Sequence, residues 1–336
     1  MEEAKATSHN IGFVVIGRNE GERLKTGLNA IQAICPQAPV VYVDSGSTDD
    51  SVAFANTINI NTVELDMSIP FTAARARNTG FLTLLKQHSD IEYVQFLDGD
   101  CELLSGWIDT AVNYLTEHKD IGIVSGRRSE RFPEASIYNQ LIDIEWNTPP
   151  GEILAVLGDM CVKVEAFERI NGFNETIIAA EDDDFCLRAR RAGYLTYRID
   201  APMSKHDANI MTLSQWYRRS KRGGHGYANI HHLHGKGPEH YFKREIKSVL
   251  FWGALIPSAF VLFLFLAPVL SLMILLAYIA FISKTILRRW RLGDSPRTAI
   301  AYGLLIFSGK VSEFMGMIQY CKNHLLSRKH QLIEYK

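Results

Sequence analysis

One feature constrains this chain most, a run of 36 consecutive residues without a charged side chain between Lys247 and Lys284. Pro257 and Pro268 lie inside this run, which is rich in Leu, Phe, Ile and Ala. A bilayer core takes about 20 apolar residues per helix, so the run is too long for one upright span and slightly short for two. The run predicts a membrane hairpin over about residues 249–283, and the alternative is a buried helix pair of a soluble protein.

Both flanks of the run are positively charged. Under the positive-inside rule, such flanks favour a hairpin that leaves and returns on the cytoplasmic side. A further apolar segment, at about residues 299–321, carries Lys310 and Glu313 near its middle. Charges there make a free-standing span costly, so we expect an interfacial or tightly packed amphipathic helix, or alternatively a third membrane helix.

Charge is divided unevenly along the 336 residues. Residues 1–204 hold 17 Lys/Arg and 31 Asp/Glu, whereas residues 205–336 hold 19 and 6. An acidic front half argues against nucleic acid as a partner. A basic back half suits an anionic membrane surface or phosphate groups.

The five cysteines are scattered, without a CxxC pair, which indicates neither a disulfide framework nor a structural zinc site. A reducing, cytosol-facing location is the simpler interpretation. Residues 1–10 contain no apolar core typical of a signal peptide, and we expect this start to be disordered.

Short apolar runs alternate with helical patterns in the front half, as in a mostly parallel, doubly wound α/β sheet. The expected strands are residues 11–16, 40–43, 93–97, 121–126 and 194–198, and the expected helices include 73–86, 107–117 and 181–192. The loops after Gly17, Val43 and Leu97 should then share one edge of the sheet. Residues 132–151 form a long connection where an acceptor could be held. We expect a catalytic domain over 11–235 and a membrane-associated α-helical region over 236–336.

Two groups of carboxylates follow this pattern. Asp98-Gly99-Asp100 comes directly after an apolar strand, where paired hard oxygen ligands suit Mg²⁺ or Mn²⁺ beside a phosphate, although the same tripeptide also makes ordinary turns. Glu181-Asp182-Asp183-Asp184 begins a helix, where the helix dipole offsets part of the repulsion. Asp184 can pair with Arg188 one turn later, which leaves Asp182 and Asp183 for another task.

Six motifs in order make the chain resemble a family 2 glycosyltransferase of GT-A fold. They are Val14-Val15-Ile16-Gly17-Arg18-Asn19-Glu20, Val43-Asp44-Ser45-Gly46-Ser47-Thr48-Asp49, Ala76-Arg77-Asn78-Thr79-Gly80, Asp98-Gly99-Asp100, Gly172-Phe173-Asn174-Glu175 and Glu181-Asp182-Asp183-Asp184. The resemblance covers residues 11 to about 220. It implies a GT-A sheet, a nucleotide-sugar donor and a divalent cation, Mn²⁺ or Mg²⁺.

The resemblance also implies roles for individual residues. The nucleotide-sugar would be bound by Asn19, Glu20, Asp44, Arg77 and Asp98. Asp100 would be the chief metal ligand, helped by Asp98. Asp182 would be the general base that takes the proton of the acceptor hydroxyl, with inversion at the anomeric carbon.

Other residues are candidates of the second rank. His206 is expected to be a metal ligand or a structural histidine. Possible acceptor or diphosphate contacts are Asp159, Glu181, Gln215, Arg218 and Arg219. Gln215-Trp216-Tyr217-Arg218-Arg219 only partly resembles the motif of processive members, because Arg219 stands where Trp is expected, and Ser45 replaces a second Asp found in many relatives. His225, His231, His232, His234 and His240 match no standard zinc spacing and favour a polar interfacial loop.

Together these patterns predict an inverting, metal-dependent glycosyltransferase anchored at the cytoplasmic face of the membrane. Its donor would be a UDP-sugar by default, and its acceptor would be lipid-linked, in cell-envelope polysaccharide or glycolipid synthesis. A sugar nucleotidyltransferase is the alternative enzyme, but it needs a Gly-rich basic first loop, which the segment from Gly17 to Gly21 imitates poorly. A non-catalytic scaffold on the same fold would be expected to lose the acidic residues that are present here.

Overall fold

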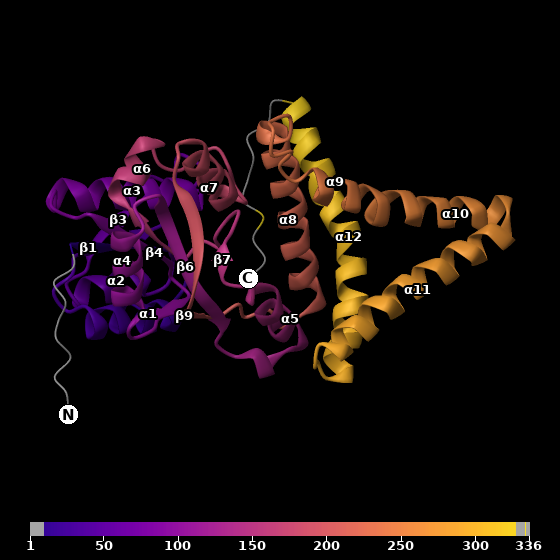
Figure 1. The fold of residues 1–336 in the computed structure, drawn as a ribbon, viewed down its shortest axis with the longest axis horizontal. Coiled ribbons are helices and arrows are strands. Elements are labelled where there is room, and N and C mark those ends of the chain that lie inside the picture. The colour runs from indigo at the N-terminus through magenta and orange to yellow at the C-terminus, as the bar shows by residue number, and fades with distance from the viewer. Residues whose placement is uncertain (1–9, 327–332, 334–336) are drawn as a thin grey trace. The chain divides into compact units, whose positions relative to one another are not determined.

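A computed structural model describes residues 10–326 and residue 333 (Figure 1). The chain divides into two compact units: residues 1–131, 143–177 and 181–208 form the first, and residues 132–142, 178–180 and 209–336 form the second. The predicted disordered start lies, apart from Asn10, outside the described residues. The first unit is called the sheet unit below, and the second the helical unit.

The sheet unit is built on nine strands, β1 to β9, with one path in the order β3-β2-β1-β4-β8-β6-β9-β5 and with β7 paired to β9. The strands are β1 (Ile11–Gly17), β2 (Val40–Asp44), β3 (Asn61–Glu64), β4 (Tyr93–Asp98), β5 (Cys101–Leu103), β6 (Ile121–Glu130), β7 (Gly151–Glu152), β8 (Met160–Lys163) and β9 (Leu195–His206). Strands β1, β2, β3 and β4 are parallel, whereas β8 runs antiparallel to β4 and β6. The predicted, mostly parallel α/β sheet is confirmed.

Helices cover both faces of this sheet, as the buried runs of its central strands require. The helices that begin in this part of the chain are α1 (Glu22–Ile34), α2 (Ser51–Thr57), α3 (Ala73–Gln87), α4 (Trp107–Glu117), α5 (Ile137–Trp146), α6 (Val164–Arg169) and α7 (Glu181–Arg191), with a short 3₁₀ turn at Pro133–Ala135. One apolar core packs α1, α2 and α4 against one face, and a second packs α3, α6 and α7 against the other. Both faces are thus closed to water.

Two stretches differ from the sequence prediction. The segment 132–151 was expected to be a long connection, but it holds the 3₁₀ turn, helix α5 and strand β7. Strands β3, β5 and β8 were not expected at all, because segments of three or four residues carry too little periodicity to detect. Strands β6 and β9 also run on beyond the predicted ends, to Glu130 and His206.

From Leu213 on, the described part of the helical unit contains helices α8 (Leu213–His234), α9 (Lys243–Val249), α10 (Ile256–Leu266), α11 (Pro268–Arg291) and α12 (Pro296–Leu325). A π-helical segment at Leu250–Leu255 joins α9 to α10. Helices α8 and α12 lie against each other at very small residues. A Cβ added to Gly224 would lie 1.9 Å from the carbonyl oxygen of Glu313, and one on Gly316 would lie 2.0 Å from that of Lys221. The expected amphipathic segment 299–321 is therefore one continuous helix whose backbone touches α8.

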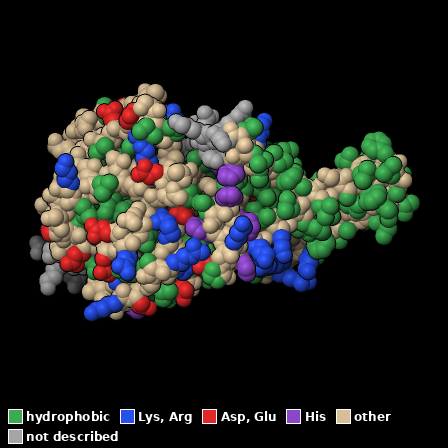
Figure 2. Space-filling view, turned by 90° about the horizontal axis from the view of Figure 1, so that it is seen from above, with side chains coloured by type: hydrophobic (Ala, Val, Ile, Leu, Met, Phe, Trp, Pro, Cys, Tyr) green, Lys and Arg blue, Asp and Glu red, His purple; other side chains and the backbone are tan. Residues whose placement is uncertain are grey.

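The apolar run forms two helices long and apolar enough to cross a membrane, Lys243–Leu266 and Pro268–Arg291. They meet at Ala267, where the backbone leaves the helical region, and Pro268 starts the second helix because its ring suits a first helical position. Figure 2 shows hydrophobic side chains covering the α10–α11 hairpin, with Lys, Arg and His side chains near its base. Phe265, close to the bend, is 80% exposed, so the hairpin packs on little of the described chain.

Candidate active site

Three loops meet at one edge of the sheet, because three parallel strands end there. The register pairs Gly17 of β1 with Asp44 of β2, and Ile16 of β1 with Asp98 of β4. The predicted shared edge is confirmed. Residues separated by up to 82 positions in sequence, Ile16 and Asp98, are therefore neighbours in space.

Asp44 organises the loop after β2. Its buried carboxylate accepts hydrogen bonds from the backbone N–H groups of Gly46 (2.9 Å) and Ser47 (2.7 Å) and from the hydroxyl groups of Ser47 (2.5 Å) and Tyr42 (2.8 Å). Burial, reinforced by Asp44, raises the pKa of Tyr42, which keeps the phenol protonated and donating. Asp44 thus shapes the loop that follows it and holds Gly46 at φ 82°, a left-handed conformation that glycine adopts without strain.

Asn19 joins the first loop to the second. Its backbone N–H donates to the Ser47 hydroxyl (2.8 Å), and its side-chain oxygen accepts from the Thr48 N–H (2.7 Å). Its neighbour Glu20 forms an ion pair with Arg23 at 2.9 Å. These contacts give Asn19 and Glu20 structural roles at the edge where a nucleotide was expected.

Arg77, on α3, ties the two acidic motifs together. Its guanidinium donates to Asp98 and to Glu181, each at 2.7 Å, and lies over the ring of Phe173. The side chain is 2% exposed, and while burial alone would lower the pKa of Arg77, the two carboxylates outweigh it and raise the pKa. Gly158, at φ 92°, lets the backbone pass close by, since an added Cβ would lie 3.0 Å from Arg77 and 3.1 Å from Asp98. One buried cation thus joins the two carboxylate motifs, a link that the sequence did not predict.

Asp100 and His206 are the pair of residues best placed to bind a cation. The Asp100 carboxylate lies 3.2 Å from Nε2 of His206, and both side chains are buried. The His206 Nδ1 atom is buried without a hydrogen-bond partner in the described part of the chain. Burial, with Arg128 as the next cause, lowers the pKa of His206 to about 4, so its imidazole is neutral, as a metal ligand requires.

Cys101 completes the one group of three potential ligand residues found within residues 10–326, with ligand atoms no more than 4.8 Å apart. Burial, with Asp159 as the next cause, raises the pKa of the Cys101 thiol well above its usual value. A protonated thiol is a poor ligand, so carboxylate oxygen and imidazole nitrogen dominate the site, a donor set that fits Mn²⁺ or Mg²⁺. Asp98, expected among the metal ligands, accepts a hydrogen bond from Arg77 through one of its two oxygens at 2.7 Å.

Asp182 lies in the first turn of α7, next to Glu181. Burial raises the pKa of Asp182 from 3.8 to about 7, Glu181 adds to the rise, and Arg77 opposes it. One of its oxygens accepts the Asp183 N–H at 3.1 Å. The predicted Asp184–Arg188 pair is confirmed at 2.8 Å. Because its pKa lies near neutral pH, the Asp182 carboxylate can accept a proton from a hydroxyl group.

Asp159 lies behind the Asp98 loop. It is 1% exposed, and its two oxygens accept from the Asp98 backbone N–H (3.2 Å) and the Ser204 hydroxyl (2.7 Å). These bonds show that Asp159 supports the end of strand β4, and its expected acceptor contact stays a prediction.

Two residues of this site escaped the sequence analysis. Arg128, on β6, lies 4.0 Å from Asp98 and 4.3 Å from the ring centroid of Trp146. Trp146 also contacts the ring of His206, edge on, at 4.6 Å between centroids. Buried and half-buried residues alternate from Arg127 to Glu130, a signal of a strand that continues past Gly126.

Gln215, Arg218 and Arg219 belong to α8 of the helical unit. Gln215 forms a capping box with Thr212 at the N-terminus of α8, so the side chain of Gln215 has a structural role there. Arg218 donates to Ser214 at 3.2 Å, and Arg219 lies 6.0 Å from the Trp216 ring centroid.

The expectation of a polar loop for the histidine cluster is wrong, because four of the five histidines lie on α8. They make ring contacts there, such as His232 with His324 at 4.5 Å.

Comparison with known proteins agrees with this geometry. The family model "Glycosyl transferase family 2" matches residues 13–162. The model "Glycosyl transferase family group 2" matches residues 121–289, and this second match alone covers just over half of the chain. The fold and site define a nucleotide-sugar glycosyltransferase of GT-A fold. The chain belongs to glycosyl transferase family 2.

One solved structure resembles the chain in fold over most of its length, and a second gives a weaker match. The mannosyltransferase PcManGT from Pyrobaculum calidifontis, in complex with GDP-Man and Mn²⁺, is 19% identical, with a TM-score of 0.59 over 92% of this chain and 88% of that one. TarS from S. aureus is 16% identical, with a TM-score of 0.46 over 65% of this chain, and the match spans 40% of TarS. No curated protein matches the chain.

Proposed function

We propose that this chain is an inverting, metal-dependent glycosyltransferase that moves a sugar from a nucleoside-diphosphate sugar to a hydroxyl group of a lipid-linked acceptor. The observation that carries the proposal is the link from Asp98 through Arg77 to Glu181, which holds the Asp100–His206 pair and Asp182 in one unit. The residues proposed for donor chemistry thus differ from those proposed for acceptor chemistry, and the buried ion pairs of Arg77 connect the two groups. The chain would act in cell-envelope polysaccharide or glycolipid synthesis.

The donor would lie at the edge where β1, β2 and β4 end. Asp44 and Asn19 order the loops against which the nucleobase and ribose would rest, and Asp98 would contact the ribose. UDP is the default nucleotide, and the GDP-Man bound to PcManGT makes GDP-mannose a second donor to test. Arg77 would act on the diphosphate by holding Asp98 in place, since both of its terminal nitrogens are bonded to carboxylates.

Mn²⁺ or Mg²⁺ would be held by Asp100 and His206. When bound, such an ion neutralises the charge that develops on the departing nucleoside diphosphate. The orphaned Nδ1 atom and neutral ring of His206 support this assignment.

Asp182 would be the general base. As the acceptor oxygen forms its bond to the anomeric carbon, its proton passes to Asp182 and the bond from that carbon to the diphosphate oxygen breaks. Attack from the face opposite the leaving group inverts the configuration. A pKa of about 7 suits this role, because the base is then largely ionised at neutral pH yet still basic enough to take the proton.

The acceptor would be lipid-linked because the α10–α11 hairpin anchors the enzyme in the membrane where such an acceptor diffuses. The two apolar helices support the anchor, and their positively charged flanks support a cytoplasmic catalytic unit. A reporter fused after Lys336 should be active in the cytoplasm, and a periplasmic signal would contradict this topology.

A donor screen tests the reaction directly. Full-length enzyme is incubated with UDP-, GDP- and dTDP-sugars and membrane lipid extract, and release of nucleoside diphosphate is measured with and without Mn²⁺ or Mg²⁺. Asp100→Ala should raise the metal concentration needed for half-maximal activity by about 10- to 100-fold, whereas Asp200→Ala, which removes an exposed aspartate, should not. Equal metal response in both variants would exclude Asp100 as a ligand.

A further inference from the structure

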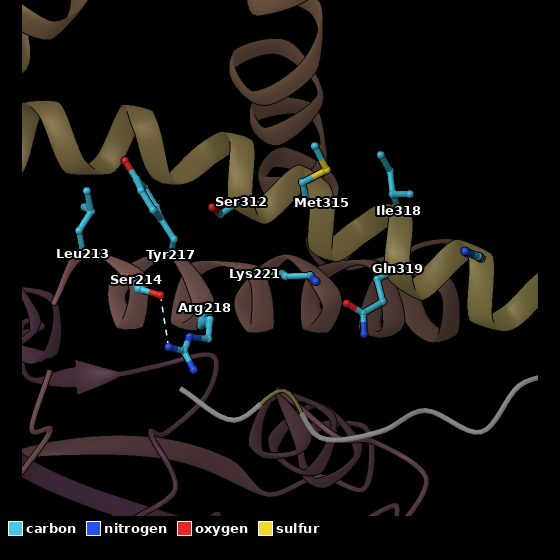
Figure 3. A pocket seen from close by; sticks show the side chains of 10 residues that line it. Leu213, Ser214, Tyr217, Arg218, Lys221, Ser312, Met315, Ile318 and Gln319 are labelled. Atoms are coloured by element: carbon cyan, nitrogen blue, oxygen red, sulfur yellow. Dashed lines mark hydrogen bonds between the residues drawn. The ribbon is translucent and has the colours of Figure 1, made fainter. Parts of the chain in front are cut away.

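A groove of about 780 Å³ runs between α8 and α12 in the helical unit (Figure 3). Its lining combines three cations, Arg218, Lys221 and Lys322, with apolar side chains that include Leu213 and Met315. No Asp or Glu is among the described residues that line it. The groove therefore offers positive charge beside an apolar surface, which is the pattern of an anionic amphiphile.

The three cations are not neutralised by the described part of the chain. Arg218 donates to the Ser214 hydroxyl at 3.2 Å, and no ion pair joins Arg218, Lys221 or Lys322 to a carboxylate among residues 10–326. Lys310, by contrast, is paired with Glu313 at 2.7 Å on the same helix α12. Three cations around one groove, none of them paired with a carboxylate of residues 10–326, create a local positive potential that favours an anion.

The groove lies next to the base of the hairpin. A Cβ added to Gly253, in the segment leading into α10, would lie 2.2 Å from the carbonyl oxygen of Lys310, and one on Gly303 would lie 2.6 Å from Ile286 of α11. The base of the hairpin thus packs on the part of α12 that precedes the groove lining. If the hairpin enters the bilayer, its base lies at the level of the lipid headgroups.

We propose that this groove binds the phosphate headgroup of an anionic bilayer phospholipid. Arg218, Lys221 and Lys322 surround the phosphate, while Met315 and Ile318 contact the start of an acyl chain. The occupant is a lipid because the apolar lining would gain nothing from a free phosphate ion. The proposal rests on the membrane anchor proposed above, and it is independent of the sugar-transfer reaction.

Lipid binding to the full-length protein in a neutral detergent tests the proposal. Dioctanoyl phosphatidylglycerol and dioctanoyl phosphatidylcholine are titrated separately, and binding is followed by native mass spectrometry without any sugar donor. Wild type should prefer the anionic lipid. The triple variant Arg218→Gln, Lys221→Gln, Lys322→Gln should bind it roughly tenfold more weakly or worse.

A matched control removes the same charge elsewhere. Lys284→Gln, Arg288→Gln, Arg291→Gln takes three cations from α11 and should leave phosphatidylglycerol binding unchanged. Equal losses in the two triple variants would overturn the proposal in favour of a general electrostatic field. Equal binding of both lipids, or displacement of phosphatidylglycerol by millimolar inorganic phosphate, would also overturn it.

Two further variants guard against a folding defect. The charge-conserving triple Arg218→Lys, Lys221→Arg, Lys322→Arg should keep the preference for the anionic lipid. Ile318→Glu should lose it, because a carboxylate would stand against the start of the acyl chain and would repel the nearby lipid phosphate. Because no donor is present, a failure here is distinguishable from a failure of the proposed reaction.

Discussion

In the sheet unit Arg77 is buried between two carboxylates, whereas no carboxylate of residues 10–326 pairs with the cations that line the groove of the helical unit. Arg77 is 2% exposed between Asp98 and Glu181, but Arg218 and Lys322 are exposed and face no carboxylate in the described chain. A buried pair costs desolvation free energy and in return holds its partners in one geometry. Exposed cations keep their hydration and can adapt to a mobile partner. The difference separates a site that must be preorganised for chemistry from a surface that meets a fluid bilayer.

Removal of the proposed base should have the largest effect. Asp182→Asn is expected to lower the transfer rate by about 10²- to 10⁴-fold, because the amide cannot accept the acceptor's proton. Donor binding, measured by calorimetry, should remain. The neighbouring variant Asp183→Asn serves as the control and should keep most activity. Retained transfer in Asp182→Asn would move the role to Asp183.

Removal of the Arg77 side chain tests the buried link between Asp98 and Glu181. Arg77→Met leaves Asp98 and Glu181 without their partner, and the free energy of unfolding should fall by about 3–5 kcal/mol. A thermal shift in detergent should show a melting temperature lower by roughly 10 °C.

Lys25→Gln is the matched surface control, since Lys25 pairs with Glu22 and Asp50 in solvent. We expect no measurable shift for Lys25→Gln. Similar melting temperatures for both variants would refute a special role for the buried ion pairs of Arg77.

The pH dependence follows from Asp182. With a pKa of about 7 in the folded protein, the base is protonated at pH 5, and transfer there should be roughly a hundredfold slower than at pH 8. If the transfer rate instead fell to half its maximum only near pH 4, the raised pKa of Asp182 would be contradicted.

Stability should respond to the same group. The folded protein keeps a proton on Asp182 that the unfolded chain has already lost above about pH 4, so this group makes stability fall as pH rises from about 4 to 7. Asp182→Asn should flatten that part of a plot of melting temperature against pH.

The helical unit offers the smallest of these effects. Gly224→Ala would place a Cβ 1.9 Å from the Glu313 carbonyl oxygen and should destabilise the α8–α12 contact by about 1–3 kcal/mol. Gly223→Ala is the control one residue away, with nothing within 4 Å, and should be neutral or stabilising by about 0.5–1 kcal/mol. A lower melting temperature for Gly224→Ala alone would confirm that close backbone packing holds this unit.

Much of the fold was predictable because its signals are local. The strands β1, β2 and β4 are short apolar runs, each followed by a polar loop, and the hairpin is a long run without charge. Strand β8 was missed because it has only four residues, and helix α5 was missed because Pro and Gly residues on either side of it are typical of a connection. Arg128 was missed for a related reason, since the polar end of β6 carries a strand's alternation but not its composition.

The sequence by itself determined the parallel strands β1, β2 and β4, the acidic motifs and the presence of an apolar hairpin, since each depends on residues close together in the chain. Only the tertiary structure decided that Arg77 joins Asp98 to Glu181, 104 residues away from it, and that Asp159 supports Asp98 from behind. It also decided that the cations of α8 and α12 share one groove. Contacts between distant residues leave no periodic pattern in a single sequence, because packing alone brings them together.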